Sequence, residues 1–269
     1  MNTTRGVRWF FRSTTALVLA FMYAPLLVVV ALSFNGSASL TWPPHDLTLK
    51  WWGKAFHNQG ARDALVNSLK VASGATIVAL VLGTMASMAV HRFKFFGRET
   101  VSLLIVLPIA LPGIVTGIAL NAAFTSAGIE FGYITLIIAH ATFCIVVMYN
   151  NVLARLRRMS PNLEEASADL GGDAFQTYRL VTFPLMRSAL LAGGLLAFGL
   201  SFDEIVVTTF TSSPGLETLP LWIFNNLSRG DQQPIVTVVA TAVMLLSIVP
   251  VWLAQRLTGE PGAVAGGTR

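Results

Sequence analysis

The segment LAFGLSFDEIVVTTF, from Leu196 to Phe210, is an apolar run interrupted by two adjacent carboxylates, Asp203 and Glu204. If this run crosses a membrane, a carboxylate near the centre of the spanning helix costs roughly 2.5–3.5 kcal/mol on insertion scales. A chain that keeps two acids there is expected to use them. Both acids lie toward the C-terminal, outward end of the run, where the helix dipole disfavours anions and favours a nearby cation.

The orientation of the two acids follows from helix geometry. Adjacent residues on a helix point about 100° apart, so Asp203 and Glu204 cannot share one face. On a continuous helix, one polar stripe consists of Ser201, Glu204, Thr208 and Thr211. We therefore predict that Glu204 lines a substrate pathway with Ser201 and Thr208, whereas Asp203 faces an adjacent helix or a second subunit. The alternative is a structural pair, satisfied by Lys, Arg or backbone groups of a partner helix.

The acids lie in one of six apolar blocks that are long enough to span a bilayer. The chain has 269 residues, of which 12% are charged, against about 25% in soluble domains. A spanning helix needs roughly 20 apolar residues, and such blocks occur at 14–34, 65–90, 101–124, 133–153, 188–210 and 235–257. The first block is too long for the core of a signal peptide, so we predict a retained helix. The predicted fold class is all-α, a polytopic membrane protein with six transmembrane helices.

Lys and Arg residues predict the orientation of these helices. With both termini in the cytoplasm, thirteen of the 18 Lys and Arg residues lie on the inner side and five on the outer side. Cytoplasmic loops carry this excess in membrane proteins. We predict a multi-pass membrane protein, with a cytoplasmic N-terminus at 1–13, a transmembrane domain at 14–257 and a disordered cytoplasmic tail at 258–269. The net charge of +5 is then a topology signal, and no nucleic-acid partner is expected.

Other polar and aromatic residues have structural interpretations. A polar group in lipid needs a partner, so interhelical hydrogen bonds are expected for His140, Asn121, Asn150 and Asn151. Pro108 and Pro112 are expected to kink the third span and so to shape a pore. Trp222 is expected either to gate the outer mouth of the pathway or to lie in the aromatic belt. The outer segment 35–64 contains a predicted short helix, which lies on the membrane or docks a partner.

The inner segment between the fourth and fifth spans is the only sizeable polar region of the chain. Ser160-Pro161 is a good helix start, because Ser can cap and Pro suits the first helical position. Gly171-Gly172 ends that helix, since Gly tolerates the left-handed conformation. Asp173 then caps a second helix, with Gln176 as its capping-box partner. Pro184 is predicted to end or kink this helix before the fifth span.

This inner segment, 154–187, carries a spaced motif. The stretch EEASADLGGDAFQTYRLVTFPL resembles the coupling motif of permease subunits of bacterial ABC importers. That motif runs Glu-Ala-Ala, three residues, Gly, nine residues, a branched apolar residue, one residue and Leu-Pro. The matching residues are Glu165, Ala166, Ser167, Gly171, Val181 and Pro184, with Ser167 in place of Ala and Phe183 in place of Leu. The resemblance implies docking to an ATPase; the alternative is an interfacial amphipathic helix without a partner.

The resemblance extends over nearly the whole chain to the polyamine (spermidine/putrescine) branch of these permeases. The segments that carry it are SFDEIVVTTFTSSPGLETLPLWIFNNL, LPIALPGIVTGIAL and AHATFCIVVMYNNVLARLRR. It implies the type I ABC importer permease fold and inward transport of a polyamine such as putrescine or spermidine. Another small amine, an amino acid or 4-aminobutyrate is the alternative substrate. Pro112-Gly113 stand where some spermidine-type sequences carry an acid after the proline, which favours the smaller amine putrescine.

The resemblance also implies a location in the bacterial inner membrane and a set of partners. These are a second permease subunit in a heterodimer, two copies of an ATPase subunit, an extracytoplasmic substrate-binding protein and the lipid bilayer. The chain lacks a G-x-x-x-x-G-K-[ST] loop, so ATP and Mg are expected on the ATPase, with no cofactor or catalytic residue here.

Two other classes of protein fit the sequence less well. A membrane-embedded enzyme would need a nucleophile with a base or a metal set, but the four His are scattered and Cys144 is the single Cys, so no metal site is expected. A self-sufficient secondary transporter would favour an inverted repeat, which the sequence does not show.

Overall fold

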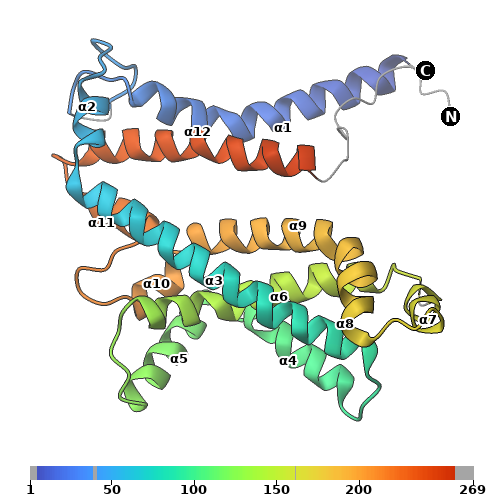
Figure 1. Cartoon of the computed structure of the whole chain (residues 1–269). Helices are drawn as coiled ribbons and strands as arrows, with labels where there is room; N and C mark the ends of the chain where they lie inside the picture. Colours follow the sequence, from blue (N-terminus) through green and yellow to red (C-terminus); the bar gives the residue numbers. More distant parts are fainter. Residues whose placement is uncertain (1–4, 39–40, 161, 258–269) are drawn as a thin grey trace. The chain divides into compact units, whose positions relative to one another are not determined.

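The computed structural model describes residues 5–38, 41–160 and 162–257. Within these ranges the regular structure is helical and no strand occurs (Figure 1). The helices are α1 (Arg5–Leu32), α2 (Lys50–Phe56), α3 (Gln59–Arg92), α4 (Arg98–Ala110), α5 (Gly113–Ser126), α6 (Tyr133–Leu156), α7 (Asn162–Asp169), α8 (Ala174–Thr177), the π-helical turn η1 (Tyr178–Thr182), α9 (Phe183–Phe202), α10 (Val206–Thr211), α11 (Leu219–Leu227) and α12 (Gln233–Leu257). The described part of the chain is therefore all-α, as predicted. The predicted cap partner Pro161 and the tail at 258–269 lie outside the described residues.

Several of these helices suit a membrane. Four described segments are long and apolar enough to cross it, namely α1, α3, α6 and the stretch Ala174–Phe202. The number rises to five if α4 and α5 together form one bent span. The predicted sixth span coincides with α12, whose apolar described part, Gln233–Ile248, is a shorter helix. The chain is a membrane protein, and the count of six spans stays a prediction.

The third predicted span is broken. α4 and α5 are bent by 105° relative to each other, so the kink expected in the span at 101–124 is present as a break between two helices. Leu111 between them is extended, with ψ 144°. The residue before a proline is driven out of the helical region by the proline ring, and Pro112 itself offers no N–H to continue the ladder. Pro112 therefore breaks the span, whereas Pro108 lies within α4.

The chain divides into two compact units, Met1–Arg62 with Ile223–Ser247 and Asp63–Trp222 with Ile248–Arg269. In the first unit, the predicted short helix of the outer segment is α2. Its Trp51 is buried and its Trp52 stacks on Phe34, with ring centroids 5.5 Å apart. The loop before α2 is closed by backbone hydrogen bonds, including one from Thr48 N to the Phe34 carbonyl at 2.8 Å.

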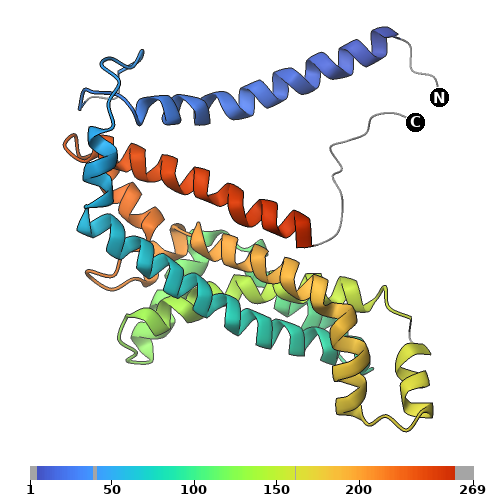
Figure 2. The ribbon, with the colours of Figure 1, turned by 45° about the horizontal axis from the view of Figure 1, so that its top comes forward.

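The second unit has a core in which helices approach one another closely. α6 and α9 run side by side (Figures 1 and 2). Met148 on α6 is fully buried, and glycines of two other helices face it. A Cβ added to Gly193 on α9 would lie 2.8 Å from the Met148 sulfur, and one added to Gly83 on α3 would lie 2.8 Å from its Cβ. Small residues at these positions let the helix backbones approach, as is usual in membrane bundles.

Candidate functional site

The fifth predicted span is broken at the two acids. α9 ends before Asp203 and α10 begins after Ile205, so Asp203 and Glu204 lie between two helices. The prediction of one continuous helix through Leu196–Phe210 is therefore wrong, and with it the single polar stripe. A broken helix leaves backbone groups and polar side chains free to line a cavity inside a membrane protein. The acid pair thus lies in a type of local structure that suits a transport site.

The break places the two acids in different environments. Glu204 is half-buried, and its Oε1 accepts a hydrogen bond of 2.8 Å from the backbone N–H of Val207, at the start of α10. This is the three-residue relation of a helix cap, in which a side-chain oxygen satisfies an otherwise free amide. Asp203 is exposed and follows the last turn of α9. Among the residues that the structure describes, no hydrogen bond or ion pair to its carboxylate is found.

α5 holds α10 through three residues spaced four apart, Gly113, Gly117 and Asn121. A Cβ added to Gly117 would lie 2.6 Å from Cδ2 of Phe210, so only a glycine permits this approach. Asn121 Nδ2 donates a hydrogen bond of 2.6 Å to the Phe210 carbonyl. This bond satisfies a carbonyl in the last turn of α10, which has no partner within the helix. The pattern Gly-x-x-x-Gly-x-x-x-Asn in the sequence is a signal for this contact, because small residues four apart let two helices approach closely.

His140 joins the helices on either side of the break. Its ring is fully buried, with Nδ1 2.8 Å from Ser201 Oγ on α9 and Nε2 2.9 Å from Thr208 Oγ1 on α10. Thr208 Oγ1 in turn donates to the Glu204 carbonyl at 2.9 Å. The expectation that His140 makes interhelical hydrogen bonds is confirmed. These bonds also occupy the hydroxyls of Ser201 and Thr208, both of which are buried.

The other polar and aromatic residues singled out in the sequence differ in their hydrogen bonds and in their exposure. Asn121 makes the interhelical bond described above, whereas Asn151 donates within its own helix, to the Val147 carbonyl at 2.9 Å. Asn150 is exposed in the described chain. Trp222 is buried, with 6% of its surface exposed, on α11. The pathway roles predicted for Glu204, Asp203, Ser201, Thr208 and Trp222 stay predictions.

The inner loop folds as two helices joined by a tight bend. Gly171 has φ +82°, a conformation that favours glycine, and its N–H bonds to the Ala168 carbonyl at 2.9 Å. Gly172 N bonds to the Ser167 carbonyl at 2.9 Å. These two bonds form a Schellman motif that ends α7. The predicted capping box of the second helix is also present: Gln176 N donates to Asp173 Oδ1 at 2.8 Å.

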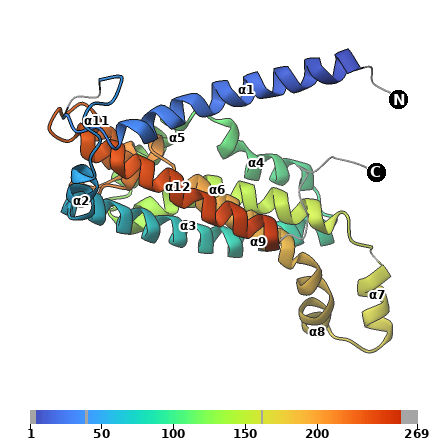
Figure 3. The same ribbon diagram turned by 90° about the horizontal axis from the view of Figure 1, so that it is seen from above.

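Side chains connect the two helices of this loop to each other and to the body of the second unit. Ser167 Oγ lies 2.8 Å from Thr177 Oγ1, and Thr182 donates to a Glu164 carboxylate oxygen at 3.0 Å. At the base of the loop, Arg155 Nε donates to the Leu185 carbonyl at 2.8 Å. Pro184 lies in the first turn of α9 and does not end the helical stretch, because η1 carries the chain from α8 into α9. Figure 3 shows α8 and α9 running in different directions.

The motif residues at the tip of the loop face outward. Glu165 and Ala166 are exposed on α7. Large apolar side chains of the same loop are also exposed, with 90% of Leu170, 69% of Phe175 and 70% of Leu180 accessible. An apolar cluster of this kind on a polar loop indicates a surface for a protein partner.

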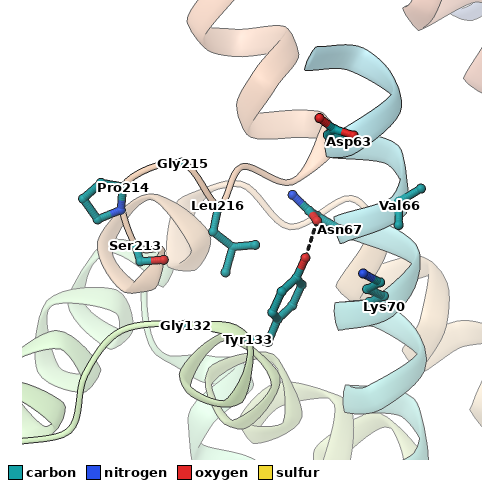
Figure 4. Close-up of a pocket in the computed structure, with 10 residues that line it drawn as sticks. All are labelled: Asp63, Val66, Asn67, Lys70, Gly132, Tyr133, Ser213, Pro214, Gly215 and Leu216. Carbon is teal, nitrogen blue, oxygen red and sulfur yellow. Dashed lines mark hydrogen bonds between the residues drawn. The ribbon is translucent and has the colours of Figure 1, made fainter. Parts of the chain in front are cut away.

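At the other end of the second unit, α3, α6 and the loop after α10 surround a pocket of about 550 Å³ (Figure 4). The Tyr133 hydroxyl donates to Asn67 Oδ1 at 2.5 Å, and Asn67 Nδ2 donates to the Glu217 carbonyl at 2.9 Å. Leu219 N donates to Ser68 Oγ at 2.7 Å. These contacts fasten the loop after α10 to α3 and to the start of α6.

A helical membrane subunit with broken spans, an acid pair in one break and a bent two-helix loop with an apolar tip has the features of a permease of an ABC importer. Residues 75–259 match the family described as "Binding-protein-dependent transport system inner membrane component". The chain belongs to this family, whose members are transport subunits and not enzymes by themselves.

Relatives of similar length support this assignment. The chain is 32% identical over 253 residues to the spermidine/putrescine transport system permease protein PotC of Haemophilus influenzae, covering 93% of this chain and 97% of the relative. It is 31% identical over 268 residues to the putrescine transport system permease protein PotI of Escherichia coli K12, covering 95% of each.

Solved structures show the same fold. A chain of a bacterial ABC transporter involved in the import of the acidic polysaccharide alginate matches with a TM-score of 0.71 at 18% identity, over 96% of this chain and 98% of that one. A second structure, of the alginate transporter with its pentasaccharide-bound periplasmic protein, matches with a TM-score of 0.73 at 14% identity, over 94% and 95%. The predicted ABC importer permease fold is therefore confirmed.

Proposed function

We propose that this permease forms half of the pathway that carries a polyamine, such as putrescine or spermidine, into the cell. The observation that carries the proposal is the acid pair in the break of the fifth span, in a chain whose relatives are named for putrescine and spermidine transport. Carboxylates suit an ammonium substrate because an opposite charge offsets their cost in a membrane. Another small amine fits the same site; a 28% identical relative is named for 2-aminoethylphosphonate.

Within the pair, the geometry favours Asp203 as the contact to the amine. The Glu204 carboxylate is already used by the Val207 amide, whereas Asp203 is exposed at the C-terminal end of α9. Carbonyl groups at that end of a helix add negative potential, which favours a cation. This reverses the roles predicted from a continuous helix, in which Glu204 lined the pathway. Ser201 and Thr208 then support the acids indirectly, because their hydroxyl groups make hydrogen bonds within the chain and do not contact the substrate.

The coupling of transport to ATP hydrolysis is assigned to the inner loop. Glu165 and Ala166 on α7 present the exposed surface for an ATPase subunit, beside the apolar side chains of Leu170 and Phe175. Gly171 supports the bend that brings the two helices together, and ATP and Mg bind to the ATPase. Two copies of that ATPase, a second permease and an extracytoplasmic binding protein complete the transporter, with both termini of this chain in the cytoplasm.

Reconstitution tests this function. The chain is co-expressed with its cognate second permease, ATPase and binding protein, and the purified complex is placed in vesicles with ATP on the ATPase side. We expect ATP-dependent accumulation of labelled putrescine that requires the binding protein, and competition by spermidine but not by an uncharged diol of the same length. Uptake that putrescine does not saturate, or competition by the diol equal to that by spermidine, would overturn the polyamine assignment. ATP should be bound and hydrolysed by the ATPase subunit, and its hydrolysis should be stimulated by the substrate-loaded binding protein through the permease.

A further inference from the structure

We propose that His140 is a positioning residue that fixes the two halves of the broken fifth span relative to each other, and thereby sets where the Asp203–Glu204 pair stands. The proposal rests on the proposed transport function for its effect on uptake. It concerns a residue that touches neither acid side chain. His140 acts through the hydroxyl groups of Ser201 and Thr208.

The hydrogen bonds determine which nitrogen of the His140 ring carries the proton. Thr208 Oγ1 donates its single proton to the Glu204 carbonyl at 2.9 Å, so toward His140 it can only accept. His140 Nε2, 2.9 Å away, must therefore carry the proton. In a neutral ring Nδ1 is then an acceptor, and the Ser201 hydroxyl, 2.8 Å away, donates to it. This assignment of protons follows from the network and not from observed hydrogens.

The result is one directed chain of hydrogen bonds across the break. It runs from Ser201 in the last turn of α9, through His140, to Thr208 in α10 and back to the backbone of Glu204. All three side chains are buried, so water does not compete for these bonds. The helical ladder of backbone hydrogen bonds is interrupted at Glu204, between the end of α9 and the Ile205 carbonyl that begins α10. The ring therefore supplies a link that a continuous helix would supply by itself.

Other contacts hold α10 mainly against α5 and α6. Asn121, Gly113 and Gly117 attach α10 to α5. If the His140 link is removed, α10 should stay on α5 while the connection through Asp203 and Glu204 becomes free to move. The acids would then be presented in several positions, which affects substrate binding more than assembly.

Cys144 provides a matched control in the same helix. It lies one turn after His140 and is also buried, and its thiol donates to the Ala197 carbonyl on α9 at 3.3 Å. This contact reaches only the helix before the break. A substitution of Cys144→Ala thus removes a hydrogen bond between α6 and α9 and leaves the His140–Thr208 bond to α10 in place.

The first experiment is a double-mutant cycle in the reconstituted complex, with uptake of putrescine normalised to assembled complex. The variants are His140→Ala, Thr208→Val and the pair, with Cys144→Ala as control. We expect each single variant to reduce uptake at low putrescine by about tenfold, chiefly through KM, and the pair to be no worse than the more damaged single variant. His140→Gln, which offers one donor and one acceptor, should recover part of the loss.

Two outcomes of the cycle would overturn the role of His140. One is a double variant whose loss equals the product of the two single losses, because His140 and Thr208 would then act independently. The other is a lower amount of complex with an unchanged KM and rate per complex, which is the behaviour of a packing residue. A Cys144→Ala variant with the same KM shift as His140→Ala would also contradict it.

The second experiment does not depend on the substrate, so it separates a failure of this inference from a failure of the proposed function. Asp203→Cys is introduced into the Cys144→Ala chain, and the rate of its modification by a soluble thiol reagent is measured in the assembled complex, with and without Thr208→Val or His140→Ala. We expect the variants to change the modification rate at least about threefold. An unchanged rate would sink the positioning role, even if putrescine uptake is normal. Absence of any putrescine uptake by the unmodified complex would refute only the substrate.

Discussion

Glu204 and Val207 are joined across the start of α10, because the backbone N–H of Val207 donates to the Glu204 carboxylate at 2.8 Å. This bond gives Glu204 a structural partner within the chain. Its neighbour Asp203 is exposed at the end of α9. The two acids, adjacent in sequence, are therefore expected to respond differently to removal of their charge.

Asp203→Asn should lower transport per assembled complex. Loss of a charged contact to an amine in a partly wet pore costs about 1–3 kcal/mol, which corresponds to a drop of roughly 5- to 150-fold. Glu204→Gln is the control, because its amide oxygen can still accept from Val207 N–H. The measurement is uptake of labelled putrescine divided by the amount of complex. Normal uptake by Asp203→Asn with strongly reduced uptake by Glu204→Gln would restore the assignment predicted from a continuous helix.

Glu204→Ala should reduce stability more than Glu204→Gln does. Alanine leaves the Val207 amide without its side-chain partner, and loss of a helix cap costs about 0.5–2 kcal/mol. Thermal unfolding of the purified complex, followed by size-exclusion chromatography, measures the difference. Equal stability of the two variants would mean that the cap does not contribute.

Gly117→Ala should destabilise the packing of α10 on α5. The added Cβ would lie 2.6 Å from the Phe210 ring, and overpacking of this kind typically costs about 1–3 kcal/mol. Gly199→Ala on α9 is the control, since no atom lies within 4 Å of its added Cβ. The yield of folded complex and its thermal midpoint are compared. If both variants have the same yield and thermal midpoint, Gly117 does not hold α10 against α5.

Glu165→Lys and Gly171→Leu should abolish uptake while the chain still reaches the membrane. Glu165 is exposed on α7 and its charge would be reversed, and Gly171 has φ +82°, which costs a leucine about 1–2 kcal/mol. Glu99→Lys, an exposed acid at the start of α4, is the control for charge alone. The readout is substrate-stimulated ATP hydrolysis by the purified complex. Full stimulation of ATP hydrolysis in either variant would show that the substituted residue of the inner loop is not needed for coupling.

The orientation can be tested with fusions. A reporter that is active only outside the cytoplasm should stay silent when fused after Arg269 and should be active near Gly215, in the loop after α10. The expectation depends on the excess of Lys and Arg on the inner side. The opposite pattern would invert the topology.

Features of the inner loop could be predicted from sequence because their causes are local. The capping box joins Asp173 to Gln176, three residues apart, and the Schellman bonds of Gly171 and Gly172 reach back at most five residues. The break at Pro112 has a local cause as well, because a proline removes an amide and restricts the residue before it. The expectation of a kink was correct there, and the structure gives the bend as 105°.

The break at Asp203 and Glu204 had no such local signal. The run from Leu196 to Phe210 has no proline and, apart from the acids, the composition of a spanning helix. Its α10 half is held by His140 and Asn121, which lie 68 and 89 residues from their partners in the chain. The amino-acid sequence by itself determined that two acids lie in a membrane segment and that a bent, capped loop follows the fourth span. Only the packing of α5 and α6 against α10 decided which acid accepts a hydrogen bond at the start of α10 and which is exposed. Hydrogen bonds between distant residues form only once their helices are in contact.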